Sequence, residues 1–153
     1  MTEISAGLVA KDMKIAVVVS RFNSFLTDQL VKGAVDAFTR LGGKDADIVL
    51  VKVPGAYELP LAVKKLAVSG KVDAVVALGA VVQGATPHAT LINETTARAF
   101  SEISMSEMIP VIDGVVSADS LEQAVERCGT KQGNKGFSAM QAAIEMVDLM
   151  RKV

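Results

Sequence analysis

The sequence predicts an α/β fold in which helices cover both faces of a parallel sheet of about four strands. Four short runs are rich in β-branched residues and lack the alternation of a half-exposed strand, which is typical of strands buried on both faces. Helical periodicity fills the stretches between these runs, and strands that alternate with helices are joined by right-handed parallel crossovers. A chain of 153 residues fits one domain, so we treat residues 1–153 as a single unit.

Strands are expected at the four β-branched runs, which are residues 14–20, 47–53, 73–79 and 109–116. Ligands of parallel sheets bind beyond the carboxyl ends of the strands. We therefore expect the residues that carry function directly after each run.

Five helices are expected, at residues 24–41, 58–68, 86–105, 120–128 and 136–152. In the first two, apolar residues recur three or four positions apart. Gly42 and Gly43 stop the first helix, and Thr86 followed by Pro87 predicts the N-cap and the first helical position of the third.

The composition narrows the class of protein. Hydrophobic residues make up 50% of the chain, which excludes disorder and is somewhat apolar for a soluble monomer, so part of the surface is expected to pack against copies of the same chain. A net charge of −1 without a basic block argues against nucleic acid or a polybasic membrane surface as a partner. One cysteine and one histidine argue against a structural zinc site.

A cytoplasmic location is expected. Cys128 is the only cysteine and cannot form an internal disulfide, which suits a reducing compartment. Residues 1–7 lack the charged start and apolar stretch of a signal peptide, and the longest apolar run, residues 74–82, is too short to span a bilayer. We therefore expect neither secretion nor membrane insertion.

Two of the few aromatic side chains follow the first two runs. The segment SRFNS contains neither the glycines of a phosphate-binding loop nor the carboxylates of a phosphoacceptor domain. Phe22 could stack there on a planar ring, or it could fold into the core while Asn23 or Ser24 caps the helix. After the second run, Glu58 suits the first turn of a helix, and beside Tyr57 it could also hold a ring that bears hydroxyl groups.

The segment after the third run combines an anion site with the only histidine. A helix that begins at Thr86 and Pro87 leaves the amides of Gly84 and Ala85 free, which suits a phosphate. His88 then lies in the first turn, where the helix dipole disfavours the imidazolium and keeps the ring able to accept a proton. A lone histidine is more often a surface or core residue, but this neighbourhood makes His88 a candidate for general acid–base catalysis.

A glycine- and lysine-rich loop, residues 126–136, joins the last two helices. Its spacing does not match a Walker loop, because Asn134 stands where the second glycine should be. The loop is either a helix C-cap with solvated lysines or, through Arg127, a place where a phosphate could pair with a guanidinium.

Together these segments resemble lumazine synthase, an enzyme of riboflavin biosynthesis. The likeness covers essentially the whole chain and rests on SRFN at 20–23, VPGAYELP at 53–60, GATPH at 84–88 and ERCGTKQGNKG at 126–136. One such motif would be weak, but four in order at successive strand ends are specific. The resemblance implies a three-layer flavodoxin-like sandwich and an enzyme that needs neither cofactor nor metal.

The resemblance also implies the reaction and its residues. The family condenses 5-amino-6-(D-ribitylamino)uracil with 3,4-dihydroxy-2-butanone 4-phosphate to 6,7-dimethyl-8-ribityllumazine and releases phosphate, which is the penultimate step of riboflavin biosynthesis. Phe22 would stack on the pyrimidine, and His88 would shuttle protons. The other implied contacts are Ala56, Tyr57 and Glu58 for the ribityl arm, the backbone of Ala80, Val81 and Val82 for the ring edge, and Ala85 and Thr86 for the phosphate, with Arg127 opposite and Lys135 in the same region.

Four positions depart from the family's usual pattern. The family usually has a basic residue at Gln83, an aromatic residue and then an acid at Ala89 and Thr90, and an aromatic residue at Asp113. A neighbouring subunit would contribute Asp113 to the ring pocket, where it can hydrogen-bond the polar edge of the ring but cannot stack on it. These changes surround the predicted site.

A homo-oligomer is the partner that the resemblance implies, as a pentamer with sites between adjacent subunits or an icosahedral assembly of twelve pentamers. Residues 1–12 would form an extended arm that contacts a neighbouring subunit, and riboflavin synthase is a further candidate partner. Two alternatives stay open. One is a shell-forming or ribityl-ligand-binding relative with weak or no catalysis, and the other is a flavodoxin-like signalling or flavin domain, which the missing glycine loop disfavours.

Overall fold

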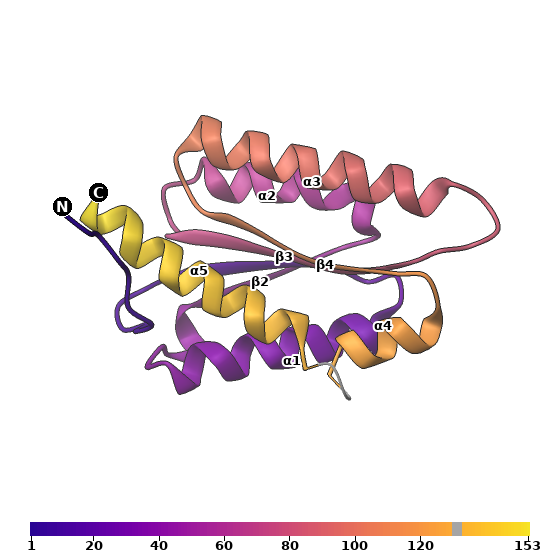
Figure 1. Cartoon of the computed structure of the whole chain (residues 1–153), viewed down its shortest axis with the longest axis horizontal. Helices are drawn as coiled ribbons and strands as arrows, with labels where there is room; N and C mark the ends of the chain where they lie inside the picture. The colour runs from indigo at the N-terminus through magenta and orange to yellow at the C-terminus, as the bar shows by residue number, and fades with distance from the viewer. Residues whose placement is uncertain (130–132) are drawn as a thin grey trace.

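The computed structural model describes residues 1–129 and 133–153, and it has three layers in which helices lie on both faces of one sheet (Figure 1). All four strands are parallel and lie in the order β2-β1-β3-β4. The strands are β1 (Ile15–Ser20), β2 (Ile48–Val53), β3 (Ala74–Val82) and β4 (Val111–Ala118). The predicted α/β fold class is confirmed.

The helices divide between the two faces as right-handed crossovers require. The chain leaves β1 for β2 in one direction and returns past β1 to β3 in the other, so the helix after β1 and the helix after β2 fall on opposite faces. One face carries α2 (Leu59–Ala67) and α3 (His88–Glu107), and the other carries α1 (Ser24–Arg40), α4 (Leu121–Arg127) and α5 (Lys135–Lys152). Two short 3₁₀ helices, Asp45–Asp47 and Ala56–Glu58, flank β2.

Two separate aliphatic cores hold the layers together, because side chains alternate along each strand. Val17 and Val19 of β1 belong to the core under α1 and α5, whereas Ala16 and Val18 belong to the core under α2 and α3. Every residue of β1 is buried, which explains why its sequence is a continuous apolar run.

A close contact between α1 and α5 depends on a glycine. A Cβ atom on Gly136 would overlap the backbone carbonyl of Leu30. Asn134 fixes the start of α5 here, since its side-chain oxygen accepts from the Phe137 N–H at 3.1 Å and its Nδ2 donates to the Gln29 carbonyl at 2.8 Å. The sequence placed this helix start at Gly136 and missed the cap.

Several predicted boundaries differ by two or three residues, and β4 begins and ends two residues later than the predicted range 109–116. The strand β3 continues past the expected end at residue 79 to Val82, because its pairing with β4 continues to the pair Val82 and Ala118. The helix α3 begins at His88 rather than Thr86, since Pro87 occupies the N-cap position and its carbonyl accepts the first helical bond, from Leu91 N–H at 3.2 Å.

The N-terminal arm lies beside the end of α5 in the same chain (Figure 1). The Asp148 carboxylate accepts from the Gly7 N–H at 2.7 Å, and Lys152 Nζ donates to the Ser5 carbonyl at 3.1 Å. Hydrogen bonds from Lys152 and Gly7 lower the pKa of Asp148. The contact of this arm with a neighbouring subunit stays a prediction.

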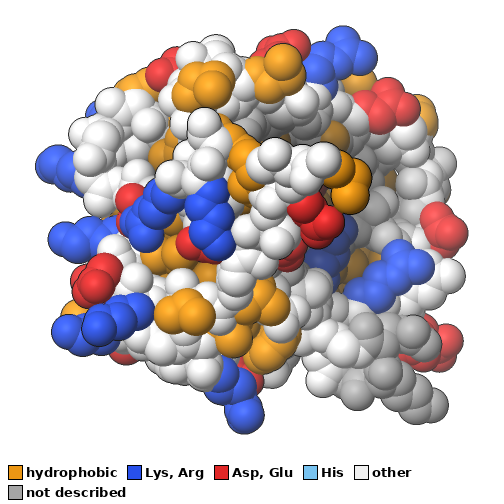
Figure 2. Space-filling model, turned by 60° about the vertical axis from the view of Figure 1, so that its left-hand side comes forward, with side chains coloured by type: hydrophobic (Ala, Val, Ile, Leu, Met, Phe, Trp, Pro, Cys, Tyr) orange, Lys and Arg blue, Asp and Glu red, His pale blue; other side chains and the backbone are white. Residues whose placement is uncertain are grey.

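Several large hydrophobic side chains remain open to solvent. On the face that Figure 2 brings forward, hydrophobic side chains lie among charged ones. Beside α2 and α3, Leu61, Met105 and Met108 are 79%, 76% and 72% exposed. Within residues 1–129 and 133–153, no helix combines the length and apolar character needed to cross a bilayer.

The substitution Gly136→Ala tests the α1–α5 contact. We expect it to lower the free energy of unfolding by about 1–3 kcal/mol, because the new methyl group forces the helices apart. Urea unfolding measures this. Gly7→Ala is the control, since a Cβ there meets only Asp148 Oδ2 at 3.8 Å, and equal stability of the two variants would contradict the close contact.

The buried thiol of Cys128 gives a pH-dependent prediction. Burial raises the pKa of Cys128 to about 11, and nearby Lys135 offsets part of this rise. The Cys128 thiol therefore loses its proton at lower pH in the unfolded chain than in the folded protein. The contribution of the protonated thiol to the free energy of unfolding is complete below pH about 9 and is lost as the pH rises to about 11. A thiol reagent at pH 8 should react slowly with the folded protein and rapidly in denaturant. Fast reaction of the folded protein would show that the thiol is accessible.

Candidate active site

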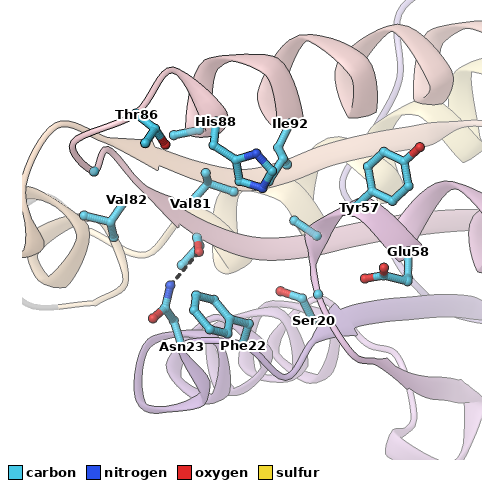
Figure 3. Close-up of a pocket in the computed structure, with 15 residues that line it drawn as sticks. Ser20, Phe22, Asn23, Tyr57, Glu58, Val81, Val82, Thr86, His88 and Ile92 are labelled. Carbon is cyan, nitrogen blue, oxygen red and sulfur yellow. Dashed lines mark hydrogen bonds between the residues drawn. The ribbon is translucent and has the colours of Figure 1, made fainter.

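A cavity of about 440 Å³ opens at the carboxyl ends of β1, β2 and β3. Its walls come from the loop after β1, the 3₁₀ turn after β2, the end of β3 and the first turns of α3 (Figure 3). Nine predicted site residues line it: Phe22, Ala56, Tyr57, Glu58, Ala80, Val81, Val82, Thr86 and His88. The site residues that were expected after different strands therefore meet in one cavity.

One wall of the cavity exists because β3 is longer than its neighbour. Pairing with β1 ends at Leu78, whereas pairing with β4 continues to Val82. Beyond Leu78, no described strand pairs with the side of β3 that faces β1, and its backbone is open to other partners. Asn23 binds one of these backbone groups, since its Nδ2 donates to the Ala80 carbonyl at 3.0 Å.

The loop after β1 holds Phe22 on the surface of the cavity. Its N–H donates to the Pro54 carbonyl at 3.1 Å, and its side chain is 73% exposed. The alternative that Phe22 folds into the core is therefore wrong. Asn23 stands at the N-cap position of α1 but makes no capping bond, because its backbone is left-handed (φ 61°) and its amide reaches β3 instead.

Tyr57, Glu58 and His88 are all exposed at the cavity. The Glu58 N–H closes the 3₁₀ turn by donating to the Gly55 carbonyl at 3.2 Å. The imidazole of His88 projects from the start of α3 into the opening above Phe22 (Figure 3). An aromatic surface, a carboxylate and an imidazole thus share one water-accessible space, which suits binding of a polar ring and proton transfer.

Three other predicted residues, Asp113, Arg127 and Lys135, do not line this cavity within the chain. Each contacts the free edge of β4 instead. The Asp113 carboxylate accepts from the Val115 N–H at 3.0 Å, Lys135 Nζ donates to the Val115 carbonyl at 2.7 Å, and Arg127 donates to the carbonyl of Ser117.

Arg127 and Lys135 also share a separate cleft of about 420 Å³. Ala85 lies in the loop next to Thr86 but is not part of the cavity wall. Of the predicted loop at 126–136, residues 130–132 lie outside the described residues. Among the described residues, no group of three or more His, Cys, Asp or Glu side chains is arranged to hold a metal ion.

Comparison with known proteins gives one family. The sequence profile of the 6,7-dimethyl-8-ribityllumazine synthase family matches residues 12–151. Enzymes of that name from Prosthecochloris aestuarii and Chlorobium limicola are 51% and 48% identical over 150 residues, which is 98% of this chain and 97% of each relative. The enzyme of that name from Syntrophus aciditrophicus is 49% identical over 154 residues and the full length of both chains.

The chain belongs to the 6,7-dimethyl-8-ribityllumazine synthase family. Lumazine synthases are transferases of riboflavin biosynthesis, so the chain is an enzyme of that class. The family that the four sequence motifs indicated is therefore confirmed. This membership favours a lumazine synthase over the signalling or flavin domain that the sequence left open.

Sequence reasoning missed part of the cavity wall. The missed residues are Ser20, Asn23, Gly55, Ala89 and Ile92, whereas Gly84 was expected beside the phosphate. A signal existed for Ile92, which lies four positions after His88 and so on the same face of α3. Ala89 was noted only as a departure from the family. For Ser20, whose position depends on the neighbouring strand, the local sequence carries no such signal.

Substitutions of Asn23 test how the loop after β1 is held at the cavity. Asn23→Gly keeps the left-handed backbone and loses the bond to Ala80, whereas Asn23→Ala loses both. We expect the Ala variant to be less stable than the Gly variant by about 1 kcal/mol, because an L side chain is strained at this φ. Urea unfolding of both variants measures the difference. Greater stability of the Ala variant, the usual order in a helix, would show that the backbone conformation is not constrained.

Proposed function

We propose that the chain condenses 5-amino-6-(D-ribitylamino)uracil with 3,4-dihydroxy-2-butanone 4-phosphate to 6,7-dimethyl-8-ribityllumazine and releases phosphate, the penultimate step of riboflavin biosynthesis. The observation that carries this proposal is the single cavity that gathers Phe22, Glu58, Thr86 and His88 in a member of the family. Each of these residue types matches one part of the reactants.

Phe22 and β3 would bind the pyrimidine. The exposed face of Phe22 can stack on the ring, and the unpaired backbone near Ala80 to Val82 can hydrogen-bond its polar edge. Ala56, Tyr57 and Glu58, in the turn after β2, would hold the ribityl arm, with the Glu58 carboxylate as acceptor for its hydroxyl groups. Both interactions orient the amine toward the second substrate and so lower the entropic barrier.

His88 would move protons in two steps. The substrate amine attacks the ketone carbonyl, and water leaves to give an imine. Loss of phosphate then requires a proton to be taken from carbon, and the ring closes when the ribitylamino nitrogen attacks the remaining carbonyl carbon and a second water leaves. An imidazole at the mouth of the cavity can accept and return these protons near neutral pH.

The phosphate site would lie between subunits. Ala85 and Thr86 stand at the start of α3, where free amides attract an anion. Arg127 and Lys135 lie on the β4 edge of the same chain, outside the cavity. We infer that the Arg127, Lys135 and Asp113 side chains that complete each site come from an adjacent copy in a homo-oligomer.

Exposed apolar surface supports this assembly. A groove of about 930 Å³ between α2 and α3 is lined by Leu61, Ile103 and Met105, among others. A pentamer, or an icosahedral assembly of pentamers, would cover such surface. The cytoplasmic location and riboflavin synthase as a further partner belong to the same proposal.

A second candidate function is a relative that binds ribityl ligands with weak or no catalysis. The observations that favour it are two changed positions. Ala89 contributes only a methyl group to the cavity wall, and the Asp113 carboxylate is engaged by the Val115 N–H.

Incubation with both substrates tests the activity, and the lumazine chromophore reports the product. We expect product with the wild-type chain and severe losses with His88→Ala and with Arg127→Ala. No product from wild-type protein at high concentration would favour the second candidate.

Mixing the two variants tests the shared site. When they are refolded together, about one quarter of the sites should pair an intact cavity with an intact Arg127 and regain activity. Wild type refolded in the same way is the control. Failure of the mixture to regain activity, with normal recovery of the control, would place Arg127 outside the neighbouring site.

A further inference from the structure

The Ser20 side chain presents a buried hydroxyl that no described residue hydrogen-bonds. Ser20 is the last residue of β1, is 1% exposed and lines the cavity. Its backbone carbonyl accepts from Thr27 Oγ1 at 2.9 Å, but its own Oγ takes part in no hydrogen bond with the described residues. Because the described residues include no fully enclosed polar side-chain atom without a partner, this Oγ opens to the cavity rather than to the core.

The position of this hydroxyl depends on Gly79 of the adjacent strand. A Cβ atom on Gly79 would lie 3.0 Å from Ser20 Oγ and 3.5 Å from Leu59 Cδ1. The glycine therefore leaves a space between the hydroxyl and the first residue of α2, directly after Glu58. Figure 3 shows Ser20 between Phe22 and Glu58 at the base of the cavity.

A hydroxyl that opens to the cavity and has no partner among the described residues can hydrogen-bond a ligand that reaches it, and such a bond contributes to affinity and specificity. We propose that Ser20 Oγ hydrogen-bonds a hydroxyl group of the polyol arm of the substrate and thereby selects ligands that carry such an arm. This inference rests on the proposed function and adds a specificity-determining residue to it.

The arm fits this position better than the other parts of the reactants. The phosphate would bind at Thr86 and the start of α3, on the side of the cavity away from α2. The ring would stack on Phe22 in the loop that follows β1. Ser20 Oγ and Leu59 Cδ1 instead lie 3.0 Å and 3.5 Å from the position that a Gly79 Cβ would take, and Leu59 directly follows the turn that contains Glu58, which can accept from the same polyol.

The test compares two probes on the full-length protein. One is 6,7-dimethyl-8-ribityllumazine, and the other is 6,7,8-trimethyllumazine, which has a methyl group in place of the arm. We expect Ser20→Ala to weaken binding of the ribityl compound about three- to tenfold, as loss of one neutral hydrogen bond does, and to leave the trimethyl compound unchanged. Fluorescence titration measures both dissociation constants.

Ser24→Ala is the matched control, because Ser24 is an exposed serine in the same segment outside the cavity wall. It should bind both probes as wild type does. Thermal unfolding should show Ser20→Ala to be as stable as wild type or more stable, since no bond is lost in the empty protein.

Three results would overturn the inference: an unchanged dissociation constant for the ribityl compound, equal weakening for both probes, or a clear loss of stability. If wild-type protein makes product while Ser20→Ala shows one of these results, only the role of Ser20 is wrong. If wild-type protein neither makes product nor binds the ribityl compound, the proposed function is wrong and the role of Ser20 falls with it.

Discussion

Parallel pairing of β1 with β3 is the constraint on which the whole site depends. In a parallel sheet every strand directs its carboxyl end to the same edge, so segments far apart in sequence meet there. The chain leaves β1 toward β2 on one side and continues to β3 on the other, which opens a crevice between β1 and β3 at the point where the strand order reverses. Phe22, Glu58 and His88 come from three connections and still share one cavity for this reason.

The two sides of β3 differ, because one faces this crevice and the other pairs with the edge strand β4. On the cavity side, β3 extends past β1 and leaves backbone groups for a ligand, and Asn23 ties the first loop to them. On the far side, β4 is an edge strand whose Val115 and Ser117 carbonyls accept from Lys135 and Arg127. These charged side chains protect the edge from unwanted strand pairing and, at the same time, hold two cations along it.

Much of this arrangement could be predicted from sequence, and the failures have physical causes. The first two strands were placed within one residue, because their β-branched runs are followed by turn-forming residues. The length of β3 was underestimated, since Gly79 resembles a strand end when its pairing with β4 cannot be seen. Ser20 was missed because the space beside its hydroxyl depends on Gly79 and Leu59, which are both far away in the sequence. The roles of Asp113, Arg127 and Lys135 stay predictions that need a neighbouring chain.

The changed positions bear on how such a cavity holds its ligand. Phe22 and Tyr57 are the two phenylalanine or tyrosine side chains in the wall, and Ala89 offers only a methyl group where the resemblance implies a ring. Stacking and apolar contact on that side are correspondingly smaller. More of the discrimination between ligands then falls on directional groups, which are the backbone of β3, the Glu58 carboxylate and the hydroxyl of Ser20. On the proposed function, such a site would recognise a polar ring with a polyol arm by its hydrogen-bonding pattern more than by its aromatic surface.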